Sequence, residues 1–150
     1  MAARSGFLDV CKLILKKIKD KNPSDNDGNT PLHRAAMFGH LGIYKLIIKN
    51  VSNKNPPNNF GKTPLHEAAS NGHLELYWYA NGKVKNNNPT DNNGWTPLHY
   101  AVKNGYFDMS KLIFECVKNR YPVNNDGKTP LDIAKERNLI GIMKLFQDKS

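Results

Sequence analysis

The chain has 150 residues, and 39% of them are hydrophobic, which is enough to bury the core of one compact domain. No stretch approaches the roughly 18 consecutive apolar residues of a membrane helix, and the first residues lack the apolar segment of a secretory signal. The 22 Lys and Arg outnumber the 13 Asp and Glu, and the resulting net charge of +9 favours acidic partners or nucleic acid without indicating a fold.

The chain from Thr30 onward consists of copies of one repeating unit, which contains two short predicted helices. The segment before Thr30 contains an incomplete copy of the same unit. Ala2–Gly6 matches the end of the first helix of that unit, and Phe7–Lys17 matches its second helix. We therefore expect two helices here, separated at Gly6. The lysines of the second segment predict a polar outer face at this end of the molecule.

The next unit shows how each copy is expected to fold. Thr30 is a good N-cap residue and Pro31 fits the first helical position, so a helix is predicted over about residues 31–38. Gly39 suits the left-handed residue that ends a helix. Apolar residues at helical spacing predict a second helix over about residues 41–49. Neither helix is long enough to be stable alone in water, so the two must pack on each other and on the next pair.

A polar connection follows, and it ends in the turn sequence Asn58-Asn59-Phe60-Gly61 just before the next Thr-Pro pair. The Thr-Pro-Leu-His sequence that begins at Thr30 recurs at Thr63 and Thr96, and Thr129 begins a Thr-Pro-Leu-Asp sequence. The steps between these threonines are identical in length, without an insertion in any of them. Four copies in register are not a coincidence.

This 33-residue period with its Thr-Pro-Leu-His signature resembles the ankyrin repeat family over the whole chain. The resemblance implies an all-α fold, an ankyrin-repeat solenoid of stacked antiparallel helix pairs with β-hairpin loops. We expect a single ankyrin-repeat domain over residues 1–150, with about four and a half repeats. The expected boundaries are a partial repeat over 1–29, repeats over 30–62, 63–95 and 96–128, and a C-terminal repeat over 129–150.

The second helices carry an aliphatic pair that is expected in the core, for example Leu46-Ile47. One copy has Tyr79-Ala80 in this place. If Tyr79 is buried, its hydroxyl needs a hydrogen-bond partner, and Ala80 removes aliphatic volume. Either neighbouring aromatic residues fill this gap, or the stack is weakest here.

No residue pattern indicates catalysis or metal binding. His33, His66 and His99 lie one repeat apart, roughly 10 Å in a stack of helices, which is too far to share a zinc ion. By resemblance to ankyrin repeats, each histidine is expected to brace its loop through a local hydrogen bond. The chain has no nucleophile elbow, phosphate-binding loop or paired-cysteine motif. We expect a protein that is not an enzyme and has no cofactor or metal.

In the ankyrin family a partner protein usually lies on the concave face, which the loop tips and the exposed sides of the first helices form. Large apolar and basic side chains at the matching positions have the composition of a binding hot spot. The predicted partner-binding residues are Arg34, Met37, Phe38, Phe60, Lys62, Trp95, Tyr100 and Lys103. Trp95 is expected to be exposed and to contribute most, with Phe38 and Phe60 as its neighbours. The predicted function is a monomeric, non-enzymatic protein-protein interaction module.

Two alternatives to this function remain open. Most of the basic excess falls on second helices and the loops after them, on the convex back, where it would attach the molecule to nucleic acid or an anionic surface. Those lysines lack interleaved aromatic residues, which makes nucleic acid the weaker interpretation. The second alternative is that the chain is a structural segment of a longer ankyrin array. Cys11 and Cys116 are expected to be free thiols, which indicates an intracellular location, with the cytoplasm as the expected compartment.

Overall fold

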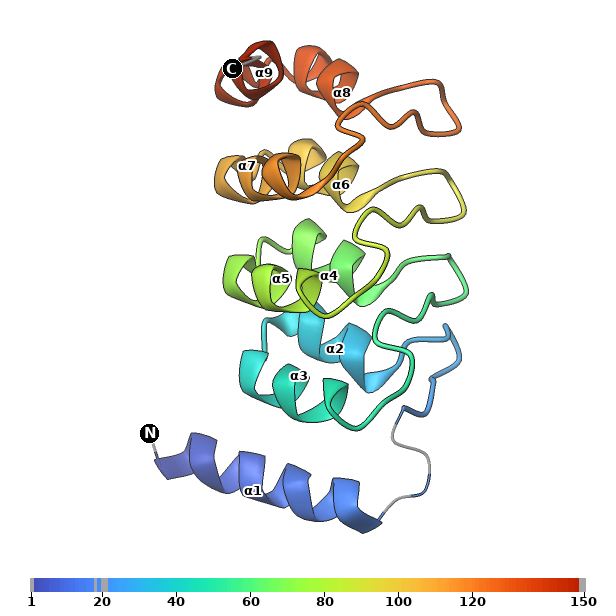
Figure 1. Cartoon of the computed structure of the whole chain (residues 1–150), viewed down its shortest axis with the longest axis vertical. Coiled ribbons are helices and arrows are strands. Elements are labelled where there is room, and N and C mark those ends of the chain that lie inside the picture. Colours follow the sequence, from blue (N-terminus) through green and yellow to red (C-terminus); the bar gives the residue numbers. More distant parts are fainter. Residues whose placement is uncertain (1, 18, 20–21, 149–150) are drawn as a thin grey trace.

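The computed structural model describes residues 2–17, 19 and 22–148 of the chain. In this part of the molecule the chain forms nine α-helices and no strand. Their bounds are α1 Ala2–Lys17, α2 Pro31–Phe38, α3 Leu41–Ile48, α4 Pro64–Ser70, α5 Leu74–Asn81, α6 Pro97–Lys103, α7 Phe107–Cys116, α8 Pro130–Glu136 and α9 Ile140–Gln147. The helices follow one another along an elongated stack, from α1 at one end to α9 at the other (Figure 1).

Two columns of helices make up this stack. The inner column contains α2, α4, α6 and α8, and each of them packs on the next. The outer column contains α1, α3, α5, α7 and α9, which also pack in chain order. Each inner helix packs on the outer helix that follows it, and the loops before the inner helices project to one side (Figure 1). The predicted all-α solenoid of stacked helix pairs is confirmed.

We call the projecting loops the fingers and define them as residues 25–29, 58–62, 91–95 and 124–128. Each finger is closed by a backbone hydrogen bond between its first and last residues, such as Asn58 N–H to the Lys62 carbonyl at 2.8 Å. The fingers are therefore hairpin-shaped turns, and within the described residues they contain no β-strand.

The core lies between the two columns. Many of its inner-helix residues are alanines, whose short side chains allow neighbouring inner helices to approach closely. The fully buried apolar residues of the inner helices are Leu32, Ala36, Leu65, Ala68, Ala69, Leu98, Ala101, Val102 and Ala134. At the end of α2, Gly39 adopts the predicted left-handed conformation with φ 69°. This residue turns the chain back so that α3 packs against α2.

The prediction of two helices before Lys17 is wrong, because α1 runs without a break through Gly6. The residues before Gly6 make about one turn and have no Thr-Pro pair to start a helix. A turn of that length is not stable by itself, whereas continuing the helix pairs its backbone groups. α1 therefore belongs to the outer column only, and it packs on α3.

The prediction that Leu46 lies in the core is also wrong. Leu46 is half-exposed, whereas Ile47 and Ile48 are buried. Tyr79, one repeat later, has the same half-exposed place as Leu46. Its ring meets the ring of Tyr44 edge-on, with the centroids 6.5 Å apart.

The tyrosine that is fully buried in this helix is Tyr77, which lies on the same helix face as Ala80 one turn later. In α7 the equivalent residues are Ser110 and Ile113, both also fully buried. In α5 and α7 one large and one small residue therefore share this space, whereas α3 buries two large residues there, Tyr44 and Ile47. Tyr77 therefore fills part of the space beside Ala80, and its hydroxyl is buried without a hydrogen-bond partner among the described residues.

Leu46→Ala should lower the free energy of unfolding by only about 1 kcal/mol, because a half-exposed side chain leaves little cavity when it is truncated. Ile47→Ala is the matched control on the same helix, and it should cost clearly more because Ile47 is buried. Urea unfolding followed by circular dichroism measures both values. Equal losses in the two variants would contradict this assignment of core residues.

Candidate functional site

The Thr-Pro-Leu-His sequence holds each inner helix against the fingers. In the second copy, Nδ1 of His66 accepts the backbone N–H of Thr63, with the two nitrogens 3.0 Å apart. The proton of the neutral ring is then on Nε2, which donates to the carbonyl oxygen of Trp95 in the next finger at 2.8 Å. His33 and His99 make the equivalent contacts. The predicted bracing role is confirmed, and each brace reaches the finger that follows.

Burial keeps these histidines neutral. The ring of His66 is fully buried, and this burial lowers its pKa from the ordinary 6.5 to about 4, although the Trp95 carbonyl partly opposes the shift. Burial also lowers the pKa values of His33 and His99. The imidazoles are therefore structural donors and acceptors at neutral pH.

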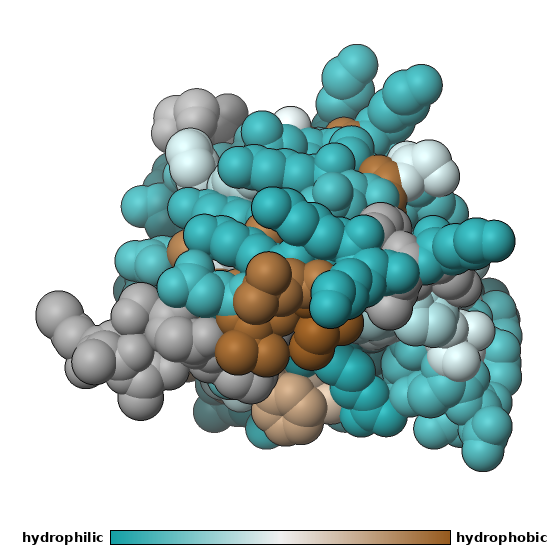
Figure 2. Space-filling model, turned by 90° about the horizontal axis from the view of Figure 1, so that it is seen from below, coloured by the Kyte–Doolittle hydropathy of each residue, from teal (hydrophilic) through white to brown (hydrophobic). Residues whose placement is uncertain are grey.

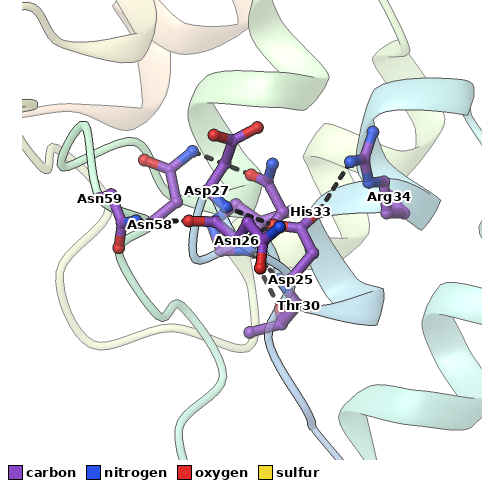
Figure 3. Close-up of polar contacts among 9 residues, drawn as sticks. Asp25, Asn26, Asp27, Thr30, His33, Arg34, Asn58 and Asn59 are labelled. Atoms are coloured by element: carbon purple, nitrogen blue, oxygen red, sulfur yellow. Dashed lines mark hydrogen bonds and ion pairs between the residues drawn. The ribbon is translucent and has the colours of Figure 1, made fainter.

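The first residue of each finger shapes its turn. In the first finger, Oδ1 of Asp25 accepts the backbone N–H groups of Asp27 and Asn29, and Oδ2 accepts a hydrogen bond from Arg34 at 2.6 Å (Figure 3). Asn58, Asp91 and Asn124 accept the same pair of backbone bonds in the later fingers. A carboxylate or amide oxygen on the first residue of a finger thus fixes the turn of that finger.

Asparagine side chains join one finger to the next. The side-chain amide of Asn59 donates to the carbonyl of Asn26 at 2.9 Å, Asn92 donates to Asn59 at 3.0 Å, and Asn125 donates to Asn92 at 3.1 Å. The backbone N–H groups of the same three residues also donate to carbonyls of the preceding finger. The fingers therefore form one continuous hydrogen-bonded surface along the stack.

Four of the eight predicted binding residues meet on this surface. The ring centroids of Trp95 and Tyr100 lie 5.0 Å apart. The Lys62 ammonium is 4.8 Å from the centroid of the Tyr100 ring, and the Lys103 ammonium is 5.2 Å from the centroid of the Trp95 ring. We call Lys62, Trp95, Tyr100 and Lys103 the aromatic-lysine cluster. Each contact between an ammonium and a ring of this kind contributes about 0.5–1 kcal/mol at an exposed site.

The cluster is anchored in the structure, and Trp95 is half-buried where exposure was expected. The Trp95 ring packs against the core and lies 5.5 Å from the ring of His99. The Tyr100 hydroxyl donates to the Asp91 carboxylate at 2.5 Å, and burial together with this carboxylate raises the pKa of the phenol well above its usual range. Removing the indole would therefore remove core contacts as well as a binding surface.

A buried carboxylate lies beside the cluster. Glu67 on α4 stands one repeat from Arg34 on α2 and one repeat from Tyr100 on α6, and it is only 7% exposed. Burial raises the pKa of Glu67, while the charges of Lys62 and Arg34 oppose this shift. Glu67 was not among the predicted binding residues, although the sequence alone shows that it shares one repeat position with Arg34 and Tyr100.

Phe60, Phe38 and Met37 are not part of the cluster. Phe60 is exposed on the second finger. Phe38 is exposed at the end of α2, where it lines a groove together with Ile14 of α1. Met37 is half-buried, and its carbonyl accepts a hydrogen bond from Nε2 of His73 at 2.9 Å. No ring contact joins Phe38 or Phe60 to Trp95 in the part of the chain that the structure describes.

The outer helices, which are the expected convex back, contain more exposed aromatic surface than expected. Trp78 is 67% exposed on α5, between the lysines Lys45 on α3 and Lys111 on α7. Glu75 and Asp108 line the same shallow groove of about 600 Å³. Carboxylates therefore stand among the lysines of this groove, unlike the continuous basic stripe that a phosphate backbone would require.

Within residues 2–17, 19 and 22–148, no group of three or more His, Cys, Asp or Glu side chains could hold a metal ion. None of the helices described is both long and apolar enough to cross a membrane. Cys116 is a free, half-buried thiol whose pKa is raised by burial, while the side chain of Cys11 lies outside the described residues.

The stacked helix pairs and the hydrogen-bonded fingers define a repeat solenoid that presents one continuous surface along its length. A family model described as ankyrin repeats (three copies) matches residues 1–80 and 75–149. The chain therefore belongs to the ankyrin repeat family. Ankyrin repeats generally serve as protein-interaction modules and are typically not enzymes. A comparison with curated proteins finds no match.

Proposed function

We propose that this protein is a non-enzymatic interaction module that binds a partner protein on its concave face, which the fingers and the exposed sides of the inner helices form. The aromatic-lysine cluster carries this proposal. It combines two large rings with two ammonium groups at the junction of the second and third fingers with α6. Aromatic and basic residues at the centre of a surface are the usual composition of binding hot spots.

The charges around the cluster suggest the chemistry of the partner. Lys62 and Lys103 would attract carboxylates, which favours an acidic segment. Glu67, whose carboxylate has no ion-pair partner among the described residues, would accept a hydrogen bond from a backbone or hydroxyl donor. We further propose a monomeric protein in the cytoplasm, where the free thiol of Cys116 would stay reduced.

Charge reversal at Lys62 and Lys103 tests the proposed face. Random 16-residue peptides displayed on phage are first selected on the wild-type protein, and the selected sequences should be enriched in Asp and Glu. The double variant Lys62→Glu/Lys103→Glu should bind these peptides at least about ten-fold more weakly, because it replaces attraction by repulsion and keeps both rings. Isothermal titration calorimetry at fixed salt measures the affinities.

The matched control is the double variant Lys45→Glu/Lys111→Glu on the convex back. Lys45 also lies over a ring, with its ammonium 5.0 Å from the centroid of Tyr79, so the control also loses a contact of this kind. This control should bind like the wild type. The concave face is the wrong surface if the back variant loses affinity and the cluster variant does not, and attachment through the basic back would then take its place.

A further inference from the structure

Polar loops connect each outer helix to the finger that follows it. We call residues 49–57, 82–90 and 117–123 the return loops, and they follow α3, α5 and α7 (Figure 1). Their Lys and Asn residues distinguish them from the α1 end of the stack, where hydrophobic side chains gather on the surface (Figure 2). A ligand of the return loops is therefore expected to be polar.

Asparagine side chains join the second return loop to the repeat that follows it. The side-chain amide of Asn87 donates to the carbonyl of Cys116, at the end of α7, at 3.1 Å. The side-chain amide of Asn88 donates to the carbonyl of Asn119, in the third return loop, at 3.2 Å. These two bonds hold the second and third repeats together at their return loops.

The first and second return loops lack such bonds. Lys54 has the repeat position of Asn87, but its ammonium donates to two carbonyls of its own repeat, at 2.7 and 3.1 Å. Asn55 has the repeat position of Asn88, and its side-chain amide makes no bond to the second loop. No hydrogen bond joins these two loops, both of which the structure describes in full, and a groove of about 830 Å³ lies between them.

Hydrogen-bond donors and positive charge line this groove. Its charged residues are Lys54, Lys83 and Lys85, and no Asp or Glu lines it. None of these three lysines forms an ion pair within the described part of the chain. Lys83 and Lys85 are exposed, and the ammonium of Lys54 uses two of its three N–H groups within its own repeat. The remaining donors are therefore available to an anionic ligand.

The lining of the groove distinguishes between possible ligands. A second copy of the chain has the same net charge of +9 and would be repelled. No aromatic side chain lines the groove, so the bases of a single-stranded nucleic acid would have no ring to stack on. A peptide with several carboxylates can distribute them over lysines of both loops. The Asn55 amide, which makes no bond between the loops, can donate to a carbonyl of that peptide.

We infer that the groove between the first and second return loops binds an extended acidic segment of a partner protein. The carboxylates of this segment pair with Lys54 on one loop and with Lys83 and Lys85 on the other, and its backbone accepts a hydrogen bond from Asn55. The segment thereby connects two repeats that lack the asparagine bonds of the next pair. No residue of the aromatic-lysine cluster lines the groove, so this site goes beyond the proposed concave-face function.

The probe is a fluorescein-labelled peptide of twelve residues in which glutamate alternates with serine. Fluorescence anisotropy at fixed salt should show saturable binding to the full chain, and a peptide with glutamine in place of glutamate should bind at least about ten-fold more weakly. Lys83→Ala/Lys85→Ala should lower the affinity for the glutamate peptide by at least about ten-fold. Lys111→Ala/Lys118→Ala is the matched control and should bind like the wild type. It also removes two exposed lysines, and Lys118 has the repeat position of Lys85.

Lys54→Asn provides a second test from the opposite side of the groove. It introduces the side chain that Asn87 has in the next repeat, so its amide should donate to the carbonyl of Lys83 and narrow the groove. This variant should also bind the glutamate peptide at least about ten-fold more weakly. Circular dichroism checks that all variants keep the helical content of the wild type.

Equal binding of the two peptides, no saturable binding, or equal affinities of Lys83→Ala/Lys85→Ala and its matched control would overturn the inference. A loss confined to Lys62→Ala/Lys103→Ala would show that the peptide binds the concave face instead. Nucleic acid would be the ligand if fluorescein-labelled oligothymidylate of twelve nucleotides bound more tightly than the glutamate peptide and lost its binding in Lys83→Ala/Lys85→Ala.

Discussion

The free energy of unfolding should fall by about 3 kcal/mol between pH 7 and pH 4 through the titration of His66 alone. The pKa of His66 is about 4 in the folded protein, against 6.5 for the unperturbed group. Between these values the unfolded chain binds a proton that the folded protein excludes, so stability is lost as the pH falls through this window. The difference between the two pKa values corresponds to roughly 3 kcal/mol.

His66→Asn isolates this contribution. An asparagine keeps a side-chain acceptor near the start of α4 but has no group that titrates in this range. The other titratable groups change the free energy of unfolding equally in both proteins. His33 and His99 also lower it as the pH falls, whereas Glu67, whose pKa is raised, acts in the opposite direction. Urea unfolding at a series of pH values should show a smaller pH dependence in the variant. Identical pH dependence in both proteins would mean that His66 is not the buried neutral group described above.

Gly61→Ala should cost about 3 kcal/mol, whereas the same change at Gly127 should cost about 1 kcal/mol. Both glycines end a finger turn in the left-handed region, with φ 75° and 74°. An added Cβ at Gly61 would lie 2.5 Å from Oδ1 and 2.7 Å from the backbone nitrogen of Asn92, the residue that links the second and third fingers. At Gly127 no atom lies within 4 Å of the added carbon.

Both variants carry the same left-handed strain, so their difference measures the link between the fingers. Thermal and urea unfolding give the two free energies, and amide hydrogen exchange at Asn92 should accelerate only in Gly61→Ala. Equal losses at the two glycines would show that the asparagine contacts between fingers contribute nothing beyond the strain.

The sequence was sufficient for the features that depend on a few neighbouring residues. Thr63 and Pro64 are neighbours in the chain, and the start of α4 at these residues follows from their chemistry alone, whereas the role of His66 was implied by the family resemblance. Repetition of this signature at a constant interval then determined the order and direction of the helix pairs, since each pair must cover the next. The placement of Lys62 and Trp95 on fingers, and of Tyr100 and Lys103 on an inner helix, follows in the same way, because it depends only on where each residue falls in the repeat.

Only the tertiary structure decided what depends on a neighbouring repeat. Burial of Trp95 and the partial exposure of Leu46 are set by packing across the stack, which helical spacing within one repeat does not define. The clustering of two lysines and two rings requires side chains from a finger and an inner helix to meet. Residues 2–17 match the two helices of a repeat in sequence, but they form the single helix α1, which continues through Gly6. A single turn with no Thr-Pro start and no described inner neighbour is less stable than a longer helix.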